Sequence, residues 1–165
     1  MIPRLIVEGK LGLKEYAVLV TDKRSIFVLG TNSKAGRGGV FGVVGAMATG
    51  AATSRRTFDY EKEDPDLLAT DPKNFVIQHH ALERLEMKKG MIGSIVRFNI
   101  EYRTVDRKNK TVKARLAPPI SVSKQNKQEG RRKEVVYLDY AKNVQDVYQR
   151  ALPAVAFTEL ADWKL

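Results

Sequence analysis

The sequence predicts a mainly β fold, α+β by content, in which an antiparallel barrel of about seven strands is capped by a C-terminal α-helix. Short runs rich in Val, Ile, Tyr and Phe are separated by clusters of turn residues, which is typical of strands joined by hairpins. Residues Ser94–Tyr102 alternate apolar and polar side chains, whereas Asp139–Leu152 repeats its apolar residues at helical spacing. The chain has 165 residues, and we expect residues 1–165 to form one domain.

The composition, 43% hydrophobic and 29% charged, is typical of a globular protein. The chain contains no cysteine, which excludes disulfides, thiolate metal sites and cysteine nucleophiles. The first apolar run is too short and too charged to resemble a signal peptide. We therefore expect a cytoplasmic protein, with association to a membrane surface as an alternative.

The charge is basic and unevenly distributed along the chain. A total of 29 Lys and Arg residues against 19 Asp and Glu residues gives a formal net charge of +10. Eleven basic and two acidic residues lie between Arg103 and Lys133, so this stretch alone carries +9. Such a concentration indicates either a solvated surface or a site for an anionic partner. Its basic residues are Arg103, Arg107, Lys108, Lys110, Lys113, Arg115, Lys124, Lys127, Arg131, Arg132 and Lys133.

The stretch Tyr16–Leu29 predicts a β-hairpin with a basic tip. Two apolar runs flank four polar residues, and Asp22 is expected to organise the turn by bonding its own backbone. Lys23 and Arg24 follow it and carry the positive charge. The first strand is apolar on both faces, so we expect other parts of the chain to cover both sides of the hairpin.

The segment Gly36–Ser54 is the expected cover for the outer side of this hairpin, within an insertion at about residues 31–72. It carries no charge from Gly38 onward, and its glycine spacing allows close backbone approach. Three interpretations stay open: a buried helix or loop with a small-residue face, a membrane-touching or self-association surface, and a transmembrane span. Four apolar side chains of this segment would mark an interface if they were exposed together on the surface. These are Val40, Phe41, Val43 and Val44.

An acidic segment, Phe58–Asp71, follows the insertion and contains a short predicted helix that begins at Pro65. Its carboxylates lack the order of a calcium loop. His79 and His80 come after the predicted strand Asn74–Gln78, and adjacent residues of a strand point to opposite sides, so they cannot chelate one ion together. We expect no metal, no cofactor and no catalytic constellation.

The remaining strands are predicted from short β-prone runs. In Ser94–Tyr102, the residues Val96, Phe98 and Ile100 are expected to face inward. The run Ile2–Val7 contains a proline and predicts an edge strand or a lead-in. Further strands are expected at Leu82–Lys89, Thr111–Ala117 and Glu134–Leu138, and the polar segment Ser121–Lys133 is expected to be mobile.

The C-terminal helix is predicted at about residues 139–152, where Asp139 can cap its first turn. One apolar stripe runs along it, formed by Tyr140, Val144, Val147, Tyr148 and Ala151. The segment Ala154–Trp163 predicts a second short helix or an apolar tail, and Trp163 is a candidate interface residue.

The segment Val20–Val28 looks like the Val-Thr-Asp-Lys-Arg hairpin of prokaryotic pleckstrin-homology-like (PH-like) and GRAM-like domains. Residues Asn74–Ile77 through Leu82–Lys88 are similar to the stretch that follows in such domains, and Gln78 stands where they often have proline. The resemblance covers roughly residues 13–152. It implies a PH-like barrel with a Gly-rich insertion after the first hairpin.

The resemblance also implies a non-enzymatic adaptor that recognises phospholipid head groups or a protein segment. Its anion site would be a set of basic residues at hairpin tips. Lys23 and Arg24 lie on one predicted tip, and Arg107, Lys108 and Lys110 lie on another. The further candidates are Lys113, Arg115, Arg131, Arg132 and Lys133.

Three functions are therefore weighed. The first is a binding module for an acidic surface, either a membrane or a protein. The second is nucleic-acid binding through the stretch 103–133, which lacks interleaved aromatic residues for base stacking. The third is a self-assembling structural module that uses Gly38–Ser54 or Ala154–Trp163 as its contact. An enzyme is the least expected class.

Overall fold

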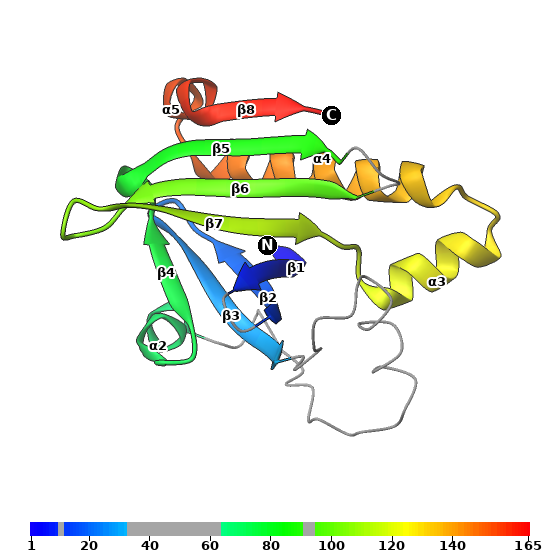
Figure 1. Ribbon diagram of the computed structural model, residues 1–165, viewed down its shortest axis with the longest axis horizontal. Coiled ribbons are helices and arrows are strands. Elements are labelled where there is room, and N and C mark those ends of the chain that lie inside the picture. The colour runs from blue at the N-terminus through cyan, green and yellow to red at the C-terminus, as the bar shows by residue number, and fades with distance from the viewer. Residues whose placement is uncertain (10–11, 33–63, 91–94) are drawn as a thin grey trace.

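The computed structural model describes residues 1–9, 12–32, 64–90 and 95–165, and Figure 1 shows its arrangement. Eight strands form one sheet in the order β4-β3-β2-β1-β7-β6-β5-β8. Neighbouring strands are antiparallel, except that β8 runs parallel to β5. The strands are β1 (Ile2–Gly9), β2 (Gly12–Val20), β3 (Arg24–Asn32), β4 (Phe75–Gln78), β5 (Leu82–Lys89), β6 (Val96–Arg103), β7 (Asn109–Leu116) and β8 (Ala161–Lys164).

The prediction of a β-rich fold with a C-terminal helix is confirmed. The sheet is open in the described residues, because β4 pairs only with β3 and β8 pairs only with β5. It is strongly bent, so that β5, β6 and β7 run across the direction of β2, β3 and β4 (Figure 1). The helical elements are α2 (Pro65–Thr70), the 3-10 turn η1 (His79–Ala81), α3 (Ile120–Gln128), α4 (Lys133–Ala151) and α5 (Ala154–Leu160).

The main core lies between the sheet and α4. Tyr140, Val144 and Tyr148 are buried, as the predicted apolar stripe requires, and the ring centroids of Phe98 and Tyr148 lie 5.6 Å apart. The predicted alternation of apolar and polar side chains along β6 is also confirmed, since Val96, Phe98 and Ile100 are buried. The local pattern therefore identified the residues on which the sheet and the helix meet.

The prediction of a last strand at Glu134–Leu138 is wrong. Helix α4 begins at Lys133 and includes these residues, so it is longer at its start than expected. Val136 is buried and lies four residues before Tyr140 and eight residues before Val144. This spacing places it on the same apolar stripe of the helix. The β-branched residues that favoured a strand fit the helix because they extend its buried face.

The segment Ser121–Lys133, which was expected to be mobile, is helical over most of its length. Residues Ile120–Gln128 form α3, and their Lys and Gln side chains are good helix formers. Gly130, at φ 70°, then reverses the chain, a conformation that glycine adopts without steric cost. Arg131 fixes this corner, because it donates to Asn126 Oδ1 at 2.8 Å and to Asp139 Oδ2 at 2.6 Å.

Strand β1 occupies the centre of the sheet rather than an edge. It pairs with β2 on one side and β7 on the other, and the register is irregular between Ile2 and Leu5. Pro3 falls in this irregular part, where a missing backbone donor is tolerated. The proline that indicated an edge strand therefore marks an irregularity in the pairing of a central strand.

The β2–β3 hairpin forms as predicted, and both of its sides are covered. Tyr16 and Val18 face the main core. On the other side, Leu68 of α2 packs with Ile26 and Val28 of β3. The short helix that begins at Pro65 thus provides cover in the described structure, whereas the Gly-rich segment and Val40, Phe41, Val43 and Val44 lie outside the described residues.

The C-terminal segment forms α5 and then β8. Trp163, expected as an interface residue, is half-buried against the main core. Its ring stacks on Phe98 at 6.0 Å and on Phe157 at 5.9 Å between centroids. A parallel edge strand was not predicted, because its partner β5 lies far away in the sequence.

Candidate functional site

The turn between β2 and β3 presents the first predicted basic tip. Thr21 organises it: the Thr21 N–H donates to the Arg24 carbonyl at 2.9 Å, and Thr21 Oγ1 accepts from the N–H groups of Lys23 and Arg24 at 3.2 and 3.1 Å. The sequence interpretation gave this role to Asp22. The hydroxyl of the preceding threonine serves instead, in the way that Ser and Thr side chains commonly satisfy turns.

The turn between β6 and β7 presents the second basic tip. Arg107 N–H donates to the Thr104 carbonyl at 2.8 Å, and Thr104 N–H donates to the Lys108 carbonyl at 2.9 Å. Thr104 Oγ1 accepts from the Lys108 N–H at 3.2 Å. Arg107 has φ 57°, a left-handed conformation that is uncommon for residues other than glycine.

The fold brings the two tips to the same side of the molecule. His79 in η1 donates its backbone N–H to the Lys23 carbonyl at 2.8 Å. Strand β5 begins directly after η1 with Leu82. Leu82 pairs with Tyr102 near the end of β6, and Tyr102 pairs with Lys110 near the start of β7. The β2–β3 turn is thus linked through η1 to the end of β6, and both turns lie at the left of Figure 1.

Several cations of these tips have no carboxylate partner among the described residues. Arg24 contacts Asp66 of α2, and Arg103 lies 2.5 Å from Glu83 Oε1. No ion pair within the described part of the chain involves the side chains of Lys23, Arg107, Lys108 or Lys110, and all four are exposed. Asp22 and Asp106 lie in the same turns and reduce the local excess of positive charge.

The remaining predicted site residues lie elsewhere. Lys113 and Arg115 are on the solvent side of β7, where Arg115 Nε donates to Glu8 Oε1 at 2.7 Å. Arg131, Arg132 and Lys133 lie at the α3–α4 corner, on the opposite side of Figure 1 from the β6–β7 turn. Arg131 is engaged by Asn126 and Asp139, and Lys133 Nζ lies 5.4 Å from the centroid of the Tyr137 ring. The basic stretch 103–133 is therefore spread over several surfaces.

A cationic row that the sequence analysis did not identify crosses the solvent side of four strands. The register places Arg115, Arg97, Lys88 and Lys164 opposite one another on β7, β6, β5 and β8. Like charges directly opposite one another in a sheet are unfavourable. Alternation within each strand could have indicated the outward faces, but the register that aligns the four cations is not visible in the sequence.

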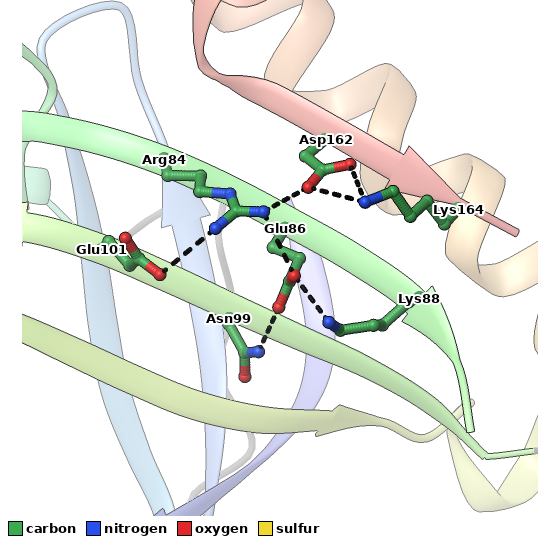
Figure 2. Close-up of polar contacts among 7 residues, drawn as sticks. All are labelled: Arg84, Glu86, Lys88, Asn99, Glu101, Asp162 and Lys164. Carbon is green, nitrogen blue, oxygen red and sulfur yellow. Dashed lines mark hydrogen bonds and ion pairs between the residues drawn. The ribbon is translucent and has the colours of Figure 1, made fainter. Parts of the chain in front are cut away.

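A charge-compensated network includes two members of this row, Lys88 and Lys164, which pair with Glu86 and Asp162 (Figure 2). Arg84 reaches Asp162 on β8, Glu86 at 3.4 Å and Glu101 at 3.9 Å. Glu86 also receives Lys88 at 2.7 Å and the Asn99 amide at 2.7 Å. The Lys88 and Asn99 hydrogen bonds hold the pKa of Glu86 below its usual value, and the Arg84 hydrogen bond does the same for the pKa of Asp162. The network is neutralised internally and ties β8 to β5.

A buried polar chain links the β2–β3 turn to α4. Ser25 Oγ lies 3.0 Å from His79 Nε2 and 3.3 Å from the Tyr148 hydroxyl, and His79 Nδ1 lies 3.2 Å from the Asp22 carbonyl. A carbonyl only accepts, so a neutral His79 carries its proton on Nδ1 and accepts the Ser25 hydroxyl at Nε2. Ser25 has one hydroxyl proton, so Tyr148 donates to Ser25 Oγ.

This chain has the partners of a nucleophilic Ser–His pair but not their accessibility. Ser25 is 1% exposed, and its oxygen is occupied by both His79 and Tyr148. Burial lowers the pKa of His79, although the Asp22 carbonyl and carboxylate oppose this shift. The arrangement fits a structural connection between β3, η1 and α4. Sequence reasoning missed it because its members are distant in the chain.

The comparisons with known proteins add no identification. No family model matches the chain, and no curated protein or solved structure matches it. Among the described residues, no helix has the length and apolar character needed to cross a membrane. No group of three or more His, Asp or Glu side chains in the described ranges could hold a metal ion.

Proposed function

We propose that this chain is a non-enzymatic PH-like module that binds anionic membrane surfaces through its two basic hairpin tips. The observation that carries the proposal is the convergence of the tips: Lys23 and the group Arg107, Lys108 and Lys110 come from distant parts of the sequence to one side of the molecule, without carboxylate partners among the described residues. The PH-like assignment is supported by seven antiparallel strands followed by an amphipathic helix that packs on their sheet.

Electrostatic attraction gives the proposed contact its strength. Each Lys or Arg near an anionic bilayer contributes about 1 kcal/mol. The four cations that have no ion pair among the described residues together supply about 4 kcal/mol at most, which suits reversible rather than permanent attachment. Since screening acts over about 8 Å at physiological ionic strength, binding is expected to weaken as salt is added.

Co-sedimentation with vesicles tests the proposal. Vesicles of phosphatidylcholine with phosphatidylserine are compared with vesicles of phosphatidylcholine alone. We expect recovery only on the anionic vesicles, and a strong loss of recovery for a tip variant that carries Lys23→Gln, Lys108→Gln and Lys110→Gln.

The matched control removes the same charge from the α3–α4 corner with Lys124→Gln, Lys127→Gln and Arg132→Gln. These residues are exposed, and the control is expected to bind like the wild type. Equal losses in both variants would show that net charge alone drives attraction. Equal recovery of the wild type on neutral and anionic vesicles would refute the proposal.

A second candidate, nucleic-acid binding, is favoured by the cationic row on the solvent side of the sheet. Arg97 in this row has no ion pair among the described residues, whereas Lys88, Lys164 and Arg115 each contact a carboxylate that a polyanion would have to displace. Adjacent strands lie about 4.8 Å apart, so the four side chains span about 14 Å. We propose this row as the contact for an extended polyanion if the tips prove inactive. Filter binding of DNA and RNA across a salt series tests it, with Arg97→Gln as the variant, and a salt slope near zero would exclude it.

A further inference from the structure

We propose that Val105 enters the apolar region of an anionic bilayer while the cations beside it contact the head groups. This inference rests on the proposed membrane function and deepens it. Val105 is 102% exposed, the highest value among the exposed large apolar side chains of the described residues. It lies at the end of the β6–β7 hairpin, which extends away from the sheet (Figure 1).

The valine is held at this position by a defined turn. The β6–β7 ladder continues to the pair formed by Arg103 and Asn109. Beyond it, the Arg107 N–H closes the turn on the Thr104 carbonyl, and the hydroxyl of Thr104 donates to the Lys108 carbonyl at 3.1 Å. Val105 is thus presented at the end of a hairpin whose turn is closed by hydrogen bonds.

Two residues in this turn are unfavourable choices for folding alone. Arg107 occupies φ 57°, where glycine or asparagine is favoured in hairpins of this kind. Val105 gains no packing at a position where polar turn residues are common. Residues held in sparsely populated backbone conformations cluster at functional sites. A partner that takes up both an apolar side chain and a cation explains both choices.

The charges around Val105 distinguish it from Val155 and Leu67, which are the next most exposed large apolar side chains of the described residues. Arg103, Arg107 and Lys108 outnumber the single acid Asp106 around Val105. By contrast, Leu67 on α2 follows Asp66, and Val155 lies on α5, whose charged residue is Glu159. A bilayer presents anionic groups at its surface and hydrocarbon directly beneath them. A dissolved phosphate or a nucleic-acid backbone would use the cations but would give the valine no apolar environment.

Single-cysteine labelling tests the insertion directly, because the chain contains no native cysteine. The variants Val105→Cys and Val155→Cys carry an environment-sensitive fluorophore, and the vesicles contain phosphatidylcholine, phosphatidylserine and a quencher on the acyl chains. Val155 is a matched control because it is also exposed, at 72%. We expect enhanced emission and acyl-chain quenching at position 105 and neither change at position 155.

A second measurement uses Val105→Thr, which retains the shape of the side chain but replaces one methyl group with a hydroxyl. Vesicle partitioning is expected to fall by about tenfold, since a buried valine contributes on this scale. Val155→Thr is expected to leave partitioning unchanged. At high salt, the residual binding of the wild type is expected to disappear in Val105→Thr.

The outcomes separate the two proposals. If the wild type binds anionic vesicles but the label at position 105 stays in water, the insertion is refuted and the membrane function remains. If the wild type shows no preference for anionic vesicles, the membrane function and the insertion of Val105 are both refuted. Retained partitioning of Val105→Thr would also refute the insertion.

Discussion

Arg107 combines an unfavourable backbone conformation with an exposed charge, so stability and binding should respond to its replacement in opposite directions. Its φ of 57° disfavours any side chain with a Cβ. We expect Arg107→Gly to raise the free energy of unfolding by up to about 1 kcal/mol, because the relief of strain exceeds the extra chain entropy of glycine. Vesicle binding should fall at the same time. Urea denaturation and co-sedimentation measure the two effects, and a destabilised Arg107→Gly would contradict the strain argument.

Burial of His79 makes the fold sensitive to mild acid. Because burial lowers the pKa of His79 in the folded state, the unfolded chain binds more protons just below the ordinary histidine value. The free energy of unfolding is therefore expected to be constant above about pH 6.5, near the unfolded pKa, and to decrease as the pH falls toward the lower folded pKa. Protonation would also place a second ring proton opposite Ser25, so Ser25 Oγ would have to accept from His79 Nε2 instead of donating to it.

Urea denaturation at a series of pH values measures this dependence. The variant His79→Gln should lose the decrease below pH 6.5. The neighbouring His80 is exposed and provides the control, so His80→Gln should keep the decrease of the wild type. The same pH dependence in the wild type and in His79→Gln would show that another group is responsible.

At the scale of elements, β8 depends on the Arg84 network for its position. Its four residues form a short parallel edge, and Arg84 links Asp162 on β8 with Glu86 and Glu101. We expect Asp162→Asn to loosen β8 and expose Trp163, the single tryptophan of the chain. The fluorescence emission should shift to longer wavelength. Glu101→Gln, whose carboxylate is 3.9 Å from Arg84, is the control and should leave the emission unchanged.

The elements that the sequence predicted well are those whose partners are local. The β2–β3 hairpin, the alternation of β6 and the α4 stripe follow from spacing within single segments. The central place of β1 and the parallel strand β8 depend on pairing between distant segments, which no local pattern encodes. Helix α4 began earlier than expected because Val136 serves either a strand or a helical stripe, and tertiary packing decided between them.

At the scale of the whole molecule, the sequence located the cations but not their grouping. Lys23, Arg107, Lys108 and Lys110 were expected on tips, yet their convergence depends on η1, which joins the two directions of the bent sheet. The sequence also did not single out Val105, since its exposure depends on the geometry of the turn. Conversely, the basic residues of 103–133 form one run in the sequence but lie on different surfaces in the fold.

Helix α4 connects the two parts of the bent sheet, so the molecule should unfold as one unit. The Tyr140 hydroxyl donates to the Arg4 carbonyl at 2.8 Å and accepts from the Arg4 N–H at 3.0 Å on β1, and Tyr148 reaches Ser25 on β3. We expect Tyr140→Phe to lower the free energy of unfolding by about 1–3 kcal/mol, because backbone groups of a central strand lose their partner.

The transitions followed by circular dichroism and by Trp163 fluorescence should remain coincident in Tyr140→Phe. Separate transitions would show that the part of the sheet containing β8 unfolds independently of the rest. A stability equal to that of the wild type would show that the hydroxyl adds nothing to the contact with β1.

The hydrogen bonds that close the two tips have a consequence for the rate and thermodynamics of association. Because Thr21 and Thr104 already fix the backbone of each turn, docking has to immobilise only the outer parts of the lysine and arginine side chains. Binding then costs little conformational entropy for ordering the turns, and the preorganised tips bind without first changing their backbone conformation. Replacing either threonine would slow capture even though every charge remained in the chain.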